Sequence, residues 1–286
     1  MRCEALPYLL SYSVGKNHEV GEILMTNGGK NLAHWRQKIR QQDKRMQFMI
    51  AMISQLQEGL RQLHSFGFSH GDLKLENICA RPGKDGNFKF TLVDLGVSSK
   101  LSRIGEDTRH KNFRGNLLTA SPDHLNNRRA GAVDDFYSLL CVAYNFTFGS
   151  LPWRDYANEH YGNDSYRHMS RRRYYIAIRK DKGEDFDREM INKGVELRQL
   201  LEHVCNLRKI RNSLDDIHKE RRIVSKRIFE MDYANFSLLL PPRAVFSRHE
   251  LDLDSWGPGK QRRHSSGNLS DYAQKHGENL DKYILA

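Results

Sequence analysis

An α+β fold is predicted by two helical patterns and a few short strand patterns in the 286-residue sequence. Apolar residues recur with helical spacing from Asp43 to Phe66, which is typical of an amphipathic helix. Residues 133–148 are apolar on nearly every helical face and predict a buried helix. Because the strand patterns are few and short, we expect a mainly helical body with a small sheet.

The first predicted elements are two strands, at residues 7–14 and 19–25, around a turn at Gly15-Lys16-Asn17. Asn27-Gly28-Gly29 then breaks the chain. The long helix of residues 43–66 follows. Its apolar positions are Met46, Met49, Ile50, Ile53, Leu56, Leu60 and Leu63.

A further strand is predicted at residues 88–92, where Phe88, Phe90 and Leu92 alternate with polar residues. A turn at residues 83–87 precedes it. For the buried helix that follows, Asp134 or Asp135 occupies the expected N-cap position.

The C-terminal third is more polar. Another amphipathic helix is marked by Leu197, Leu200, Leu201, Val204 and Cys205. Two basic stretches, residues 167–182 and 208–227, are each interpreted as a solvated helix face or an insertion. Beyond Pro241-Pro242 the sequence is rich in Ser, Gly, Asn and charge, which predicts a disordered tail.

Composition excludes some classes of protein. No apolar run approaches the roughly 18–20 residues that span a bilayer, so we expect no membrane span. The four cysteines are far apart and show no metal-binding spacing, which indicates a reducing, intracellular compartment. A net charge of +11 favours acidic partners, such as nucleic acid, an anionic membrane surface, or acidic or phosphorylated protein. A nucleic-acid-binding function is disfavoured, because no groove-reading motif or aromatic stacking platform accompanies the charge.

Two motifs carry the chemistry. His70-Gly71-Asp72-Leu73-Lys74-Leu75-Glu76-Asn77 follows the long helix, and Asp94-Leu95-Gly96 follows the strand at 88–92. Together they resemble the catalytic loop and the metal-binding motif of protein kinases. The resemblance implies a protein-kinase-like fold that uses ATP and Mg²⁺ to phosphorylate protein Ser or Thr hydroxyls.

The resemblance also implies a role for each motif residue. Asp72 would be the base, Lys74 would contact the γ-phosphate, and Asn77 and Asp94 would be metal ligands. His70, Gly96 and Asp135 would support the loops. The hinge that contacts ATP would be Ile23, Leu24, Met25 and Thr26.

Further matches resemble the casein kinase 1 family. They are Gly115-Asn116, Ala120-Ser121, Asp134-Asp135 with Ser138, Gly149-Ser150-Leu151-Pro152-Trp153, Glu196-Leu197, Cys205-Asn206-Leu207-Arg208 and Asp232-Tyr233. This resemblance implies a monomer in the cytoplasm or nucleus that acts on acidic or phosphorylated protein substrates. An anion-binding role for Arg171-Arg172-Arg173 is one alternative to a solvated surface.

The domain interpretation follows from this resemblance. Residues 1–30 would be the remnant of a kinase N-lobe, residues 31–240 the C-lobe with a basic insertion near 208–230, and residues 241–286 the tail. The Gly-rich loop and the ATP-binding lysine of kinases have no counterpart in the sequence. Two functions therefore stay open: a serine/threonine kinase, or a pseudokinase scaffold that binds protein partners without catalysis.

Overall fold

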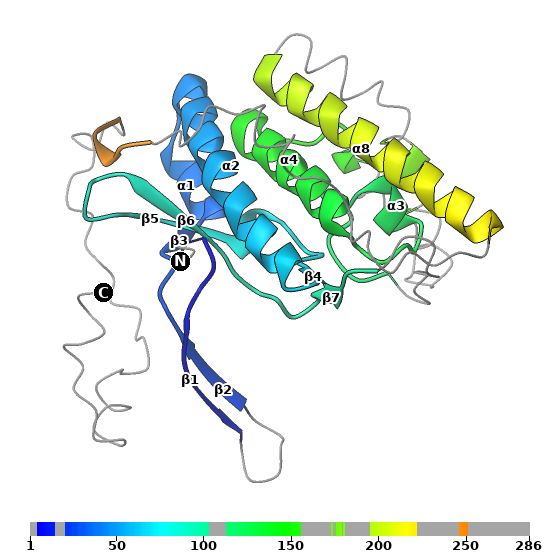
Figure 1. Ribbon diagram of the computed structural model, residues 1–286. Helices are drawn as coiled ribbons and strands as arrows, with labels where there is room; N and C mark the ends of the chain where they lie inside the picture. The colour runs from blue at the N-terminus through cyan, green and yellow to red at the C-terminus, as the bar shows by residue number, and fades with distance from the viewer. Residues whose placement is uncertain are drawn as a thin grey trace, which may run out of the picture. The chain divides into compact units, whose positions relative to one another are not determined.

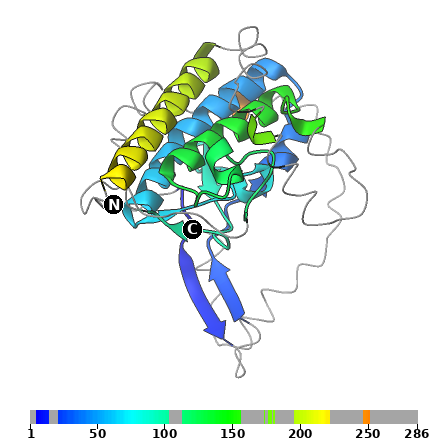
Figure 2. The ribbon, with the colours of Figure 1, turned by 90° about the vertical axis from the view of Figure 1, so that its right-hand side faces the viewer.

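The computed structural model describes residues 5–14, 21–102, 113–155, 173, 176–178, 180, 195–221 and 246–250. All of them belong to one compact unit, Met1–Leu251. Its centre consists of three long helices: α2 (Gln42–Ser65), α4 (Ala132–Phe148) and α8 (Val195–Glu220). In Figure 1 they lie side by side with α4 in the middle, and α4 packs against both of the others. Figure 2 shows the same helices from the side.

The middle helix is buried along almost its whole length, as its sequence predicts. Its core residues include Phe136, Leu139, Leu140 and Val142, each at most 2% exposed. Full burial of one such side chain is worth about 1.5–3 kcal/mol relative to exposure. The helix predictions for residues 43–66 and 133–148 are confirmed to within one residue.

Asp134 and Asp135 are not the N-cap of α4. The N-cap is Gly131. Asp134 is the third helical residue, and its carboxylate accepts a hydrogen bond from the Gly131 backbone N–H at 2.8 Å. The N-cap prediction is therefore wrong. Both carboxylates also accept hydrogen bonds from residues outside α4.

A three-stranded antiparallel sheet packs beside α2. Its strand order is β3 (Lys30–Asn31), β5 (Ile78–Pro82) and β6 (Phe88–Leu92). The predicted strand at 88–92 and the turn before it are confirmed, and the turn is closed by a Gly83 N–H bond to the Asn87 carbonyl at 2.7 Å. A second short pair joins β4 (Phe68–Ser69) to β7 (Ser99–Lys100). The short helices α1 (Leu32–Lys38) and α3 (Pro122–Leu125) complete the unit.

Phe246 shows that part of the predicted disordered tail is ordered. Its ring is fully buried and lies 5.2 Å from the ring of Phe48, centroid to centroid. Its carbonyl accepts a hydrogen bond from Phe88 N–H at 2.8 Å, and Ser247 forms a β-bridge with Asn87, so the chain here pairs with the start of β6. The disorder prediction is therefore wrong for these residues, because one aromatic side chain fills the core. Residues 251–286 lie outside the described part.

The N-terminal strands form a separate hairpin of β1 (Leu9–Val14) and β2 (Gly21–Met25), which confirms both predicted strands with shifted starts. Every residue of β1 is exposed, and the exposed side chains include Leu9, Tyr12 and Ile23 at 59%, 71% and 67%. A two-stranded sheet of this kind is at best marginally stable alone. The predicted turn at residues 15–17 lies outside the described residues.

Gly28 and Gly29 connect the hairpin to the sheet. A Cβ at Gly28 would lie 3.0 Å from the Cβ of Cys79, and one at Gly29 would lie 2.4 Å from the Ala80 carbonyl oxygen. Gly29 also has a φ of +94°, which residues with a side chain rarely adopt. The predicted break at Asn27-Gly28-Gly29 therefore has a packing cause: the chain passes directly against β5.

The second basic stretch is only partly a solvated surface: Lys209 and Arg221 are exposed, but two of its arginines are buried. Helix α8 continues without interruption to Glu220, and Arg208 and Arg211 are only 7% and 1% exposed. Arg173, from the first basic stretch, is also buried, and it donates to Asn127 Oδ1 at 2.5 Å. The solvated-surface interpretation is wrong for these arginines. Arg171 and Arg172 lie outside the described residues.

Within the described ranges, none of the helices is long and apolar enough to cross a membrane.

Candidate active site

The loop that follows β4 carries Asp72, and Asp135 holds this loop from below. The Asp135 carboxylate accepts hydrogen bonds from the backbone N–H groups of His70 and Gly71, at 2.7 and 2.9 Å. It also contacts His64 Nε2 on α2 at 2.8 Å, with both side chains 1% exposed. A carboxylate buried on α4 therefore fixes the loop to two helices of the core.

His70 fixes the next turn of the loop. Its Nδ1 accepts a hydrogen bond from Asp72 N–H at 3.3 Å, so its Nε2 is the protonated nitrogen and donates to the Val93 carbonyl at 3.1 Å. Val93 N–H in turn donates to the Asn77 carbonyl at 3.0 Å. These bonds tie the Asp72 loop to the strand end that leads into Asp94. Gly71, with a φ of +78°, permits the sharp turn between them.

Asp72 is the centre of the site. Lys74 Nζ and Asn77 Nδ2 both donate to Asp72 Oδ2, at 2.6 and 3.1 Å, and Asn77 Nδ2 also donates to the Asp72 carbonyl at 2.9 Å. Asp72 is 8% exposed and Asn77 5%. The hydrogen bond to Asp72 raises the pKa of Lys74, and the charge of Asp94 adds to this effect. Lys74 is therefore firmly cationic at neutral pH.

Asp94 follows the end of β6 and is exposed. Its φ of +65° is unusual for a residue other than glycine, although aspartate tolerates this region better than most. Gly96 N–H donates to Asp94 Oδ1 at 3.2 Å. This turn leaves Asp94 close enough for its charge to raise the pKa of Lys74. The predicted residues Asp72, Lys74, Asn77 and Asp94 therefore come together.

The oxygen atoms of Asn77 and Asp94 suit a magnesium ion. Because Asn77 Nδ2 faces Asp72, the Asn77 amide oxygen points away from it, and Asp94 supplies a carboxylate. Hard oxygen atoms of this kind are the ligands that Mg²⁺ prefers. The residues therefore fit a magnesium ion, although the described residues contain no group of three His, Cys, Asp or Glu side chains that could hold a metal without further ligands.

The segment after Gly115 contacts the loop from the other side. Thr119 Oγ1 donates to the Leu73 carbonyl at 2.6 Å. Asn116 Oδ1 accepts hydrogen bonds from Leu118 N–H and Thr119 N–H, at 2.9 and 3.2 Å, and so shapes this turn. Asn116 therefore has a local structural role in this segment.

The hinge predicted at residues 23–26 lies at the end of the β1–β2 hairpin. Thr26 and Tyr8 exchange two hydrogen bonds, Thr26 N–H to the Tyr8 carbonyl and Tyr8 N–H to Thr26 Oγ1, both at 2.9 Å. Ile23 and Met25 are exposed, and Leu24 is half-buried. No described hydrogen bond joins these residues to Asp72 or Asp94. Within the described residues, the hinge is connected to the Asp72 loop only through Gly28 and the sheet.

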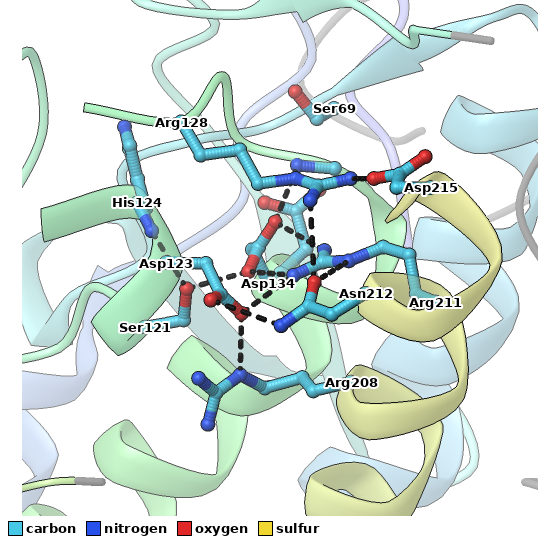
Figure 3. A network of polar contacts seen from close by, with 12 residues as sticks. Ser69, Ser121, Asp123, His124, Arg128, Asp134, Arg208, Arg211, Asn212 and Asp215 are labelled. Carbon is cyan, nitrogen blue, oxygen red and sulfur yellow. Dashed lines mark hydrogen bonds and ion pairs between the residues drawn. The ribbon is translucent and has the colours of Figure 1, made fainter. Parts of the chain in front are cut away.

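An ionic network under the site was not predicted from the sequence (Figure 3). Arg211 on α8 donates to Asp134 Oδ2 on α4 at 2.7 Å and to Asp123 Oδ2 on α3 at 2.6 Å. Arg208 Nε also donates to Asp123 Oδ2, at 2.9 Å, and Ser121 Oγ donates to Asp134 Oδ1 at 2.5 Å. The network thus joins α8 to the residue that precedes Asp135.

A signal for this network was present in the sequence. The buried face of α8 contains Leu200 and Val204 and continues at the same spacing through Arg208, Arg211 and Asp215, all at most 7% exposed. Charged residues on the apolar face of a helix indicate buried ion pairs. Arg128 and Asp215 form another ion pair of this network.

Lys180 is another buried basic residue near the site. It is 3% exposed, donates to the carbonyls of Leu118 and Ala120 at 2.8 and 2.6 Å, and lies 4.6 Å from the ring centroid of Trp153. Burial lowers its pKa to about 7. Lys180 therefore anchors the segment that contacts the Asp72 loop.

This pKa predicts how stability depends on pH. Between pH 7 and the ordinary lysine pKa of 10.5, the unfolded chain binds a proton that folded Lys180 has released, so the free energy of unfolding should rise with pH. The slope from one group is at most about 1.4 kcal/mol per pH unit. Urea unfolding at pH 7 and pH 9 should show this rise in the wild type but not in Lys180→Met. Equal pH dependence of the two proteins would contradict the prediction.

Comparison with known proteins agrees with this geometry. The family model for the protein kinase domain matches residues 16–221. The casein kinase 1-like protein HD16 of Oryza sativa subsp. japonica is 36% identical over 107 residues, which are 35% of this chain and 15% of that protein. The serine/threonine-protein kinase PknE of Mycobacterium tuberculosis is 31% identical over 110 residues, 37% of this chain and 18% of that protein. The chain thus matches less than a fifth of the length of these relatives.

The fold agrees with a solved kinase structure. Vaccinia related kinase 3 matches with a TM-score of 0.52 and 18% identity, over 77% of this chain and 69% of that one. This likeness shows the fold, and the family model covers most of the chain. The chain therefore belongs to the protein kinase domain family.

Proposed function

We propose that the chain is a serine/threonine protein kinase domain of casein-kinase-1-like type, which transfers the γ-phosphate of ATP to Ser or Thr hydroxyls of acidic or phosphorylated proteins. One observation carries the proposal: Lys74 and Asn77 both donate to Asp72 Oδ2. This arrangement holds the carboxylate in one orientation and leaves Asp72 Oδ1 to accept the proton of a substrate hydroxyl.

Each predicted residue has a defined task in this proposal. Asp72 orients and deprotonates the acceptor hydroxyl, and Lys74 places a positive charge beside the transferring phosphate. Asn77 and Asp94 would hold Mg²⁺, which would neutralise phosphate charge when bound. Because Asp135 holds the backbone of His70 and Gly71, the position of Asp72 is preorganised by the core.

The hinge and domain assignments belong to the same proposal. Residues 23–26 would contact ATP, and the β1–β2 hairpin would be the N-lobe part next to the hinge. The exposed apolar side chains of the hairpin support its pairing with further polypeptide, which would also cover the bound nucleotide. A monomeric protein in the cytoplasm or nucleus is proposed from the family resemblance.

The test is Mg²⁺-dependent transfer of phosphate from ATP to casein by the 286-residue chain. We expect transfer that is lost on chelation of Mg²⁺, and strongly reduced in Asp94→Asn, which keeps the shape of the side chain but removes its charge. Equal transfer by Asp94→Asn would indicate a contaminating kinase. Binding of a protein partner without any transfer would favour the pseudokinase scaffold.

A further inference from the structure

The side-chain nitrogen of Lys180 contacts three backbone carbonyls of one segment. Nζ donates to the carbonyl oxygens of Leu118 and Ala120 at 2.8 and 2.6 Å, and to that of Leu117 at 3.4 Å. A protonated lysine has three N–H donors, one for each of these acceptors, whereas the neutral amine has only two. The protonated side chain therefore serves all three carbonyls at once, and the neutral side chain does not.

Two aromatic rings complete the surroundings of this nitrogen. Lys180 Nζ lies 4.6 Å from the ring centroid of Trp153 and 5.8 Å from that of Tyr137. Both distances are within the range of about 6 Å over which an aromatic face attracts a positive charge. Trp153 Nε1 also donates to the Leu118 carbonyl at 2.7 Å, so the ring and the lysine hold the same peptide group. The surroundings thus suit an ammonium group, although Lys180 is only 3% exposed.

The balance of nearby charges brings the titration of Lys180 close to neutral pH. Burial lowers the pKa of Lys180 to about 7, the charge of Arg208 on α8 adds to this effect, and Cys141 on α4 opposes it. Burial raises the pKa of the Cys141 thiol to about 12, and Cys205 on α8 raises it further, so this thiol supplies no countercharge near pH 7. Among the described residues, no ion pair includes Lys180.

The segment that Lys180 holds also contacts the candidate active site. Thr119 lies between two of the bonded carbonyls, and its Oγ1 donates to the Leu73 carbonyl at 2.6 Å. Leu73 directly follows Asp72 in the sequence. A shift of Thr119 would therefore reach the peptide group next to Asp72. A misplacement of about 1 Å at a reacting group can lower a rate about 10²-fold.

We propose that Lys180 is a positioning residue for the proposed phosphate transfer, and that its protonated form holds residues 117–120, and through Thr119 the Asp72 loop, in the productive geometry. The inference rests on the proposed kinase function, because that function gives Asp72 its role. Lys180 acts only through Thr119 and Leu73, so it is not a catalytic residue. The rate of transfer should therefore follow the protonation of Lys180.

The test is the pH dependence of phosphate transfer to casein by the wild type, Lys180→Met and Lys209→Met. Lys209 is an exposed cation of α8, so Lys209→Met is the matched control and should behave as the wild type. From pH 6.5 to pH 8.5, the deprotonation of Lys180 should lower kcat/KM for casein by about 2- to 10-fold, the size of one hydrogen bond. Lys180→Met lacks this proton and should be slower than the wild type at pH 6.5, with an unchanged KM for ATP.

The ratio of the wild-type rate to the Lys180→Met rate removes any pH effect that both proteins share, such as titration of casein or ATP. This ratio should fall as the pH rises, because the wild type loses a hydrogen bond that the variant never had. A ratio that stays constant from pH 6.5 to pH 8.5 would overturn the proposal. Circular dichroism at each pH checks that the variants are folded.

A second variant tests the path from Lys180 to Asp72. Thr119→Val keeps the shape of the side chain but removes the donor to the Leu73 carbonyl. It should lower kcat/KM for casein by about 2- to 10-fold and weaken the dependence on pH, because Lys180 then no longer acts on the loop. The double variant should be about as slow as the slower single variant, since residues that act along one path are not additive. Independent effects that multiply would overturn the path through Thr119.

Hydrogen exchange without ATP separates this inference from the kinase function. The backbone N–H groups of residues 70–77 should exchange about 2- to 10-fold faster in Lys180→Met than in the wild type at pH 6.5. Transfer at equal rates in the two proteins would overturn the role of Lys180 and leave the kinase function intact. Faster exchange of the loop in Lys180→Met, in a chain without any transfer, would support the hold of Lys180 on the loop and overturn the kinase function. Equal exchange without transfer would overturn both.

Discussion

Asp72→Asn is expected to lower the rate of phosphate transfer from Mg-ATP to casein by roughly 10²- to 10⁴-fold, the usual contribution of a general base. This corresponds to about 3–5 kcal/mol of transition-state stabilisation. The amide keeps an oxygen that can accept from Lys74 and Asn77, which both donate to Asp72 Oδ2 in the wild type. The loss would therefore come from the missing negative charge and not from a collapsed loop.

The kinetic pattern should identify this role. We expect kcat to fall while the KM for ATP changes little, because Asp72 contacts the acceptor and not the nucleotide in the proposed function. Asp43→Asn, the same change at an exposed position in the first turn of α2, is the control and should leave the rate unchanged. A fall in kcat of less than about tenfold in Asp72→Asn would remove Asp72 from the role of base.

The parts of this fold that the sequence predicts are those with local signals. Helix α2 and helix α4 have long apolar patterns, and Phe88, Phe90 and Leu92 alternate through a strand that ends just before Asp94. The loop residues Asp72, Lys74 and Asn77 are close in sequence, so the motif also predicts their proximity. In each case the interacting residues lie within one element or one loop.

Contacts between distant segments could not be predicted in the same way. The Arg36 bond to the Gly149 carbonyl joins residues 113 positions apart, and the Arg211 bond to Asp123 joins residues 88 apart. Their partners depend on how the helices pack, which the spacing of apolar residues does not specify. Phe246 is a similar case, because a single aromatic residue in a polar segment gives no periodic pattern, although it fills the space beside Phe48.

The predictive value of charge patterns was also limited by burial. A run of arginines is usually a solvated surface, and residues 208–227 were predicted to be a solvated helix face or an insertion. Arg208 and Arg211 are instead buried by α3 and α4, where Asp123 and Asp134 compensate their charge. The compensating carboxylates lie in other elements, so only the helical spacing of the arginines could have indicated their burial.

Arg211→Ala is expected to reduce the free energy of unfolding by about 3–5 kcal/mol, as is typical when one partner of a buried ion pair is removed. Although burial raises the pKa of Asp134, the charge and hydrogen bonds of Arg211 lower it below its ordinary value. Without Arg211, Asp134 would lose its ion-pair partner at 1% exposure and keep only the hydrogen bonds from Ser121 and Gly131. Lys209→Ala, which removes an exposed cation from the same helix, should change stability by at most about 0.5 kcal/mol.

The pH dependence separates a buried charge from a mere loss of packing. In the wild type, the lowered pKa of Asp134 gives stability that is present above pH 3.8 and is lost as the pH falls further. In Arg211→Ala, burial without a partner should raise this pKa, so protonation at mildly acidic pH would remove part of the penalty. The difference in unfolding free energy between the two proteins should therefore shrink from pH 7 to pH 5, measured by urea denaturation. A difference that stays constant over this range would mean that Arg211 stabilises the protein through packing alone. In that case Asp134 would not depend on Arg211 for its charge. Because Arg211 is the link from α8 to Asp134, the neighbouring Asp135 would then position the Asp72 loop without support from α8.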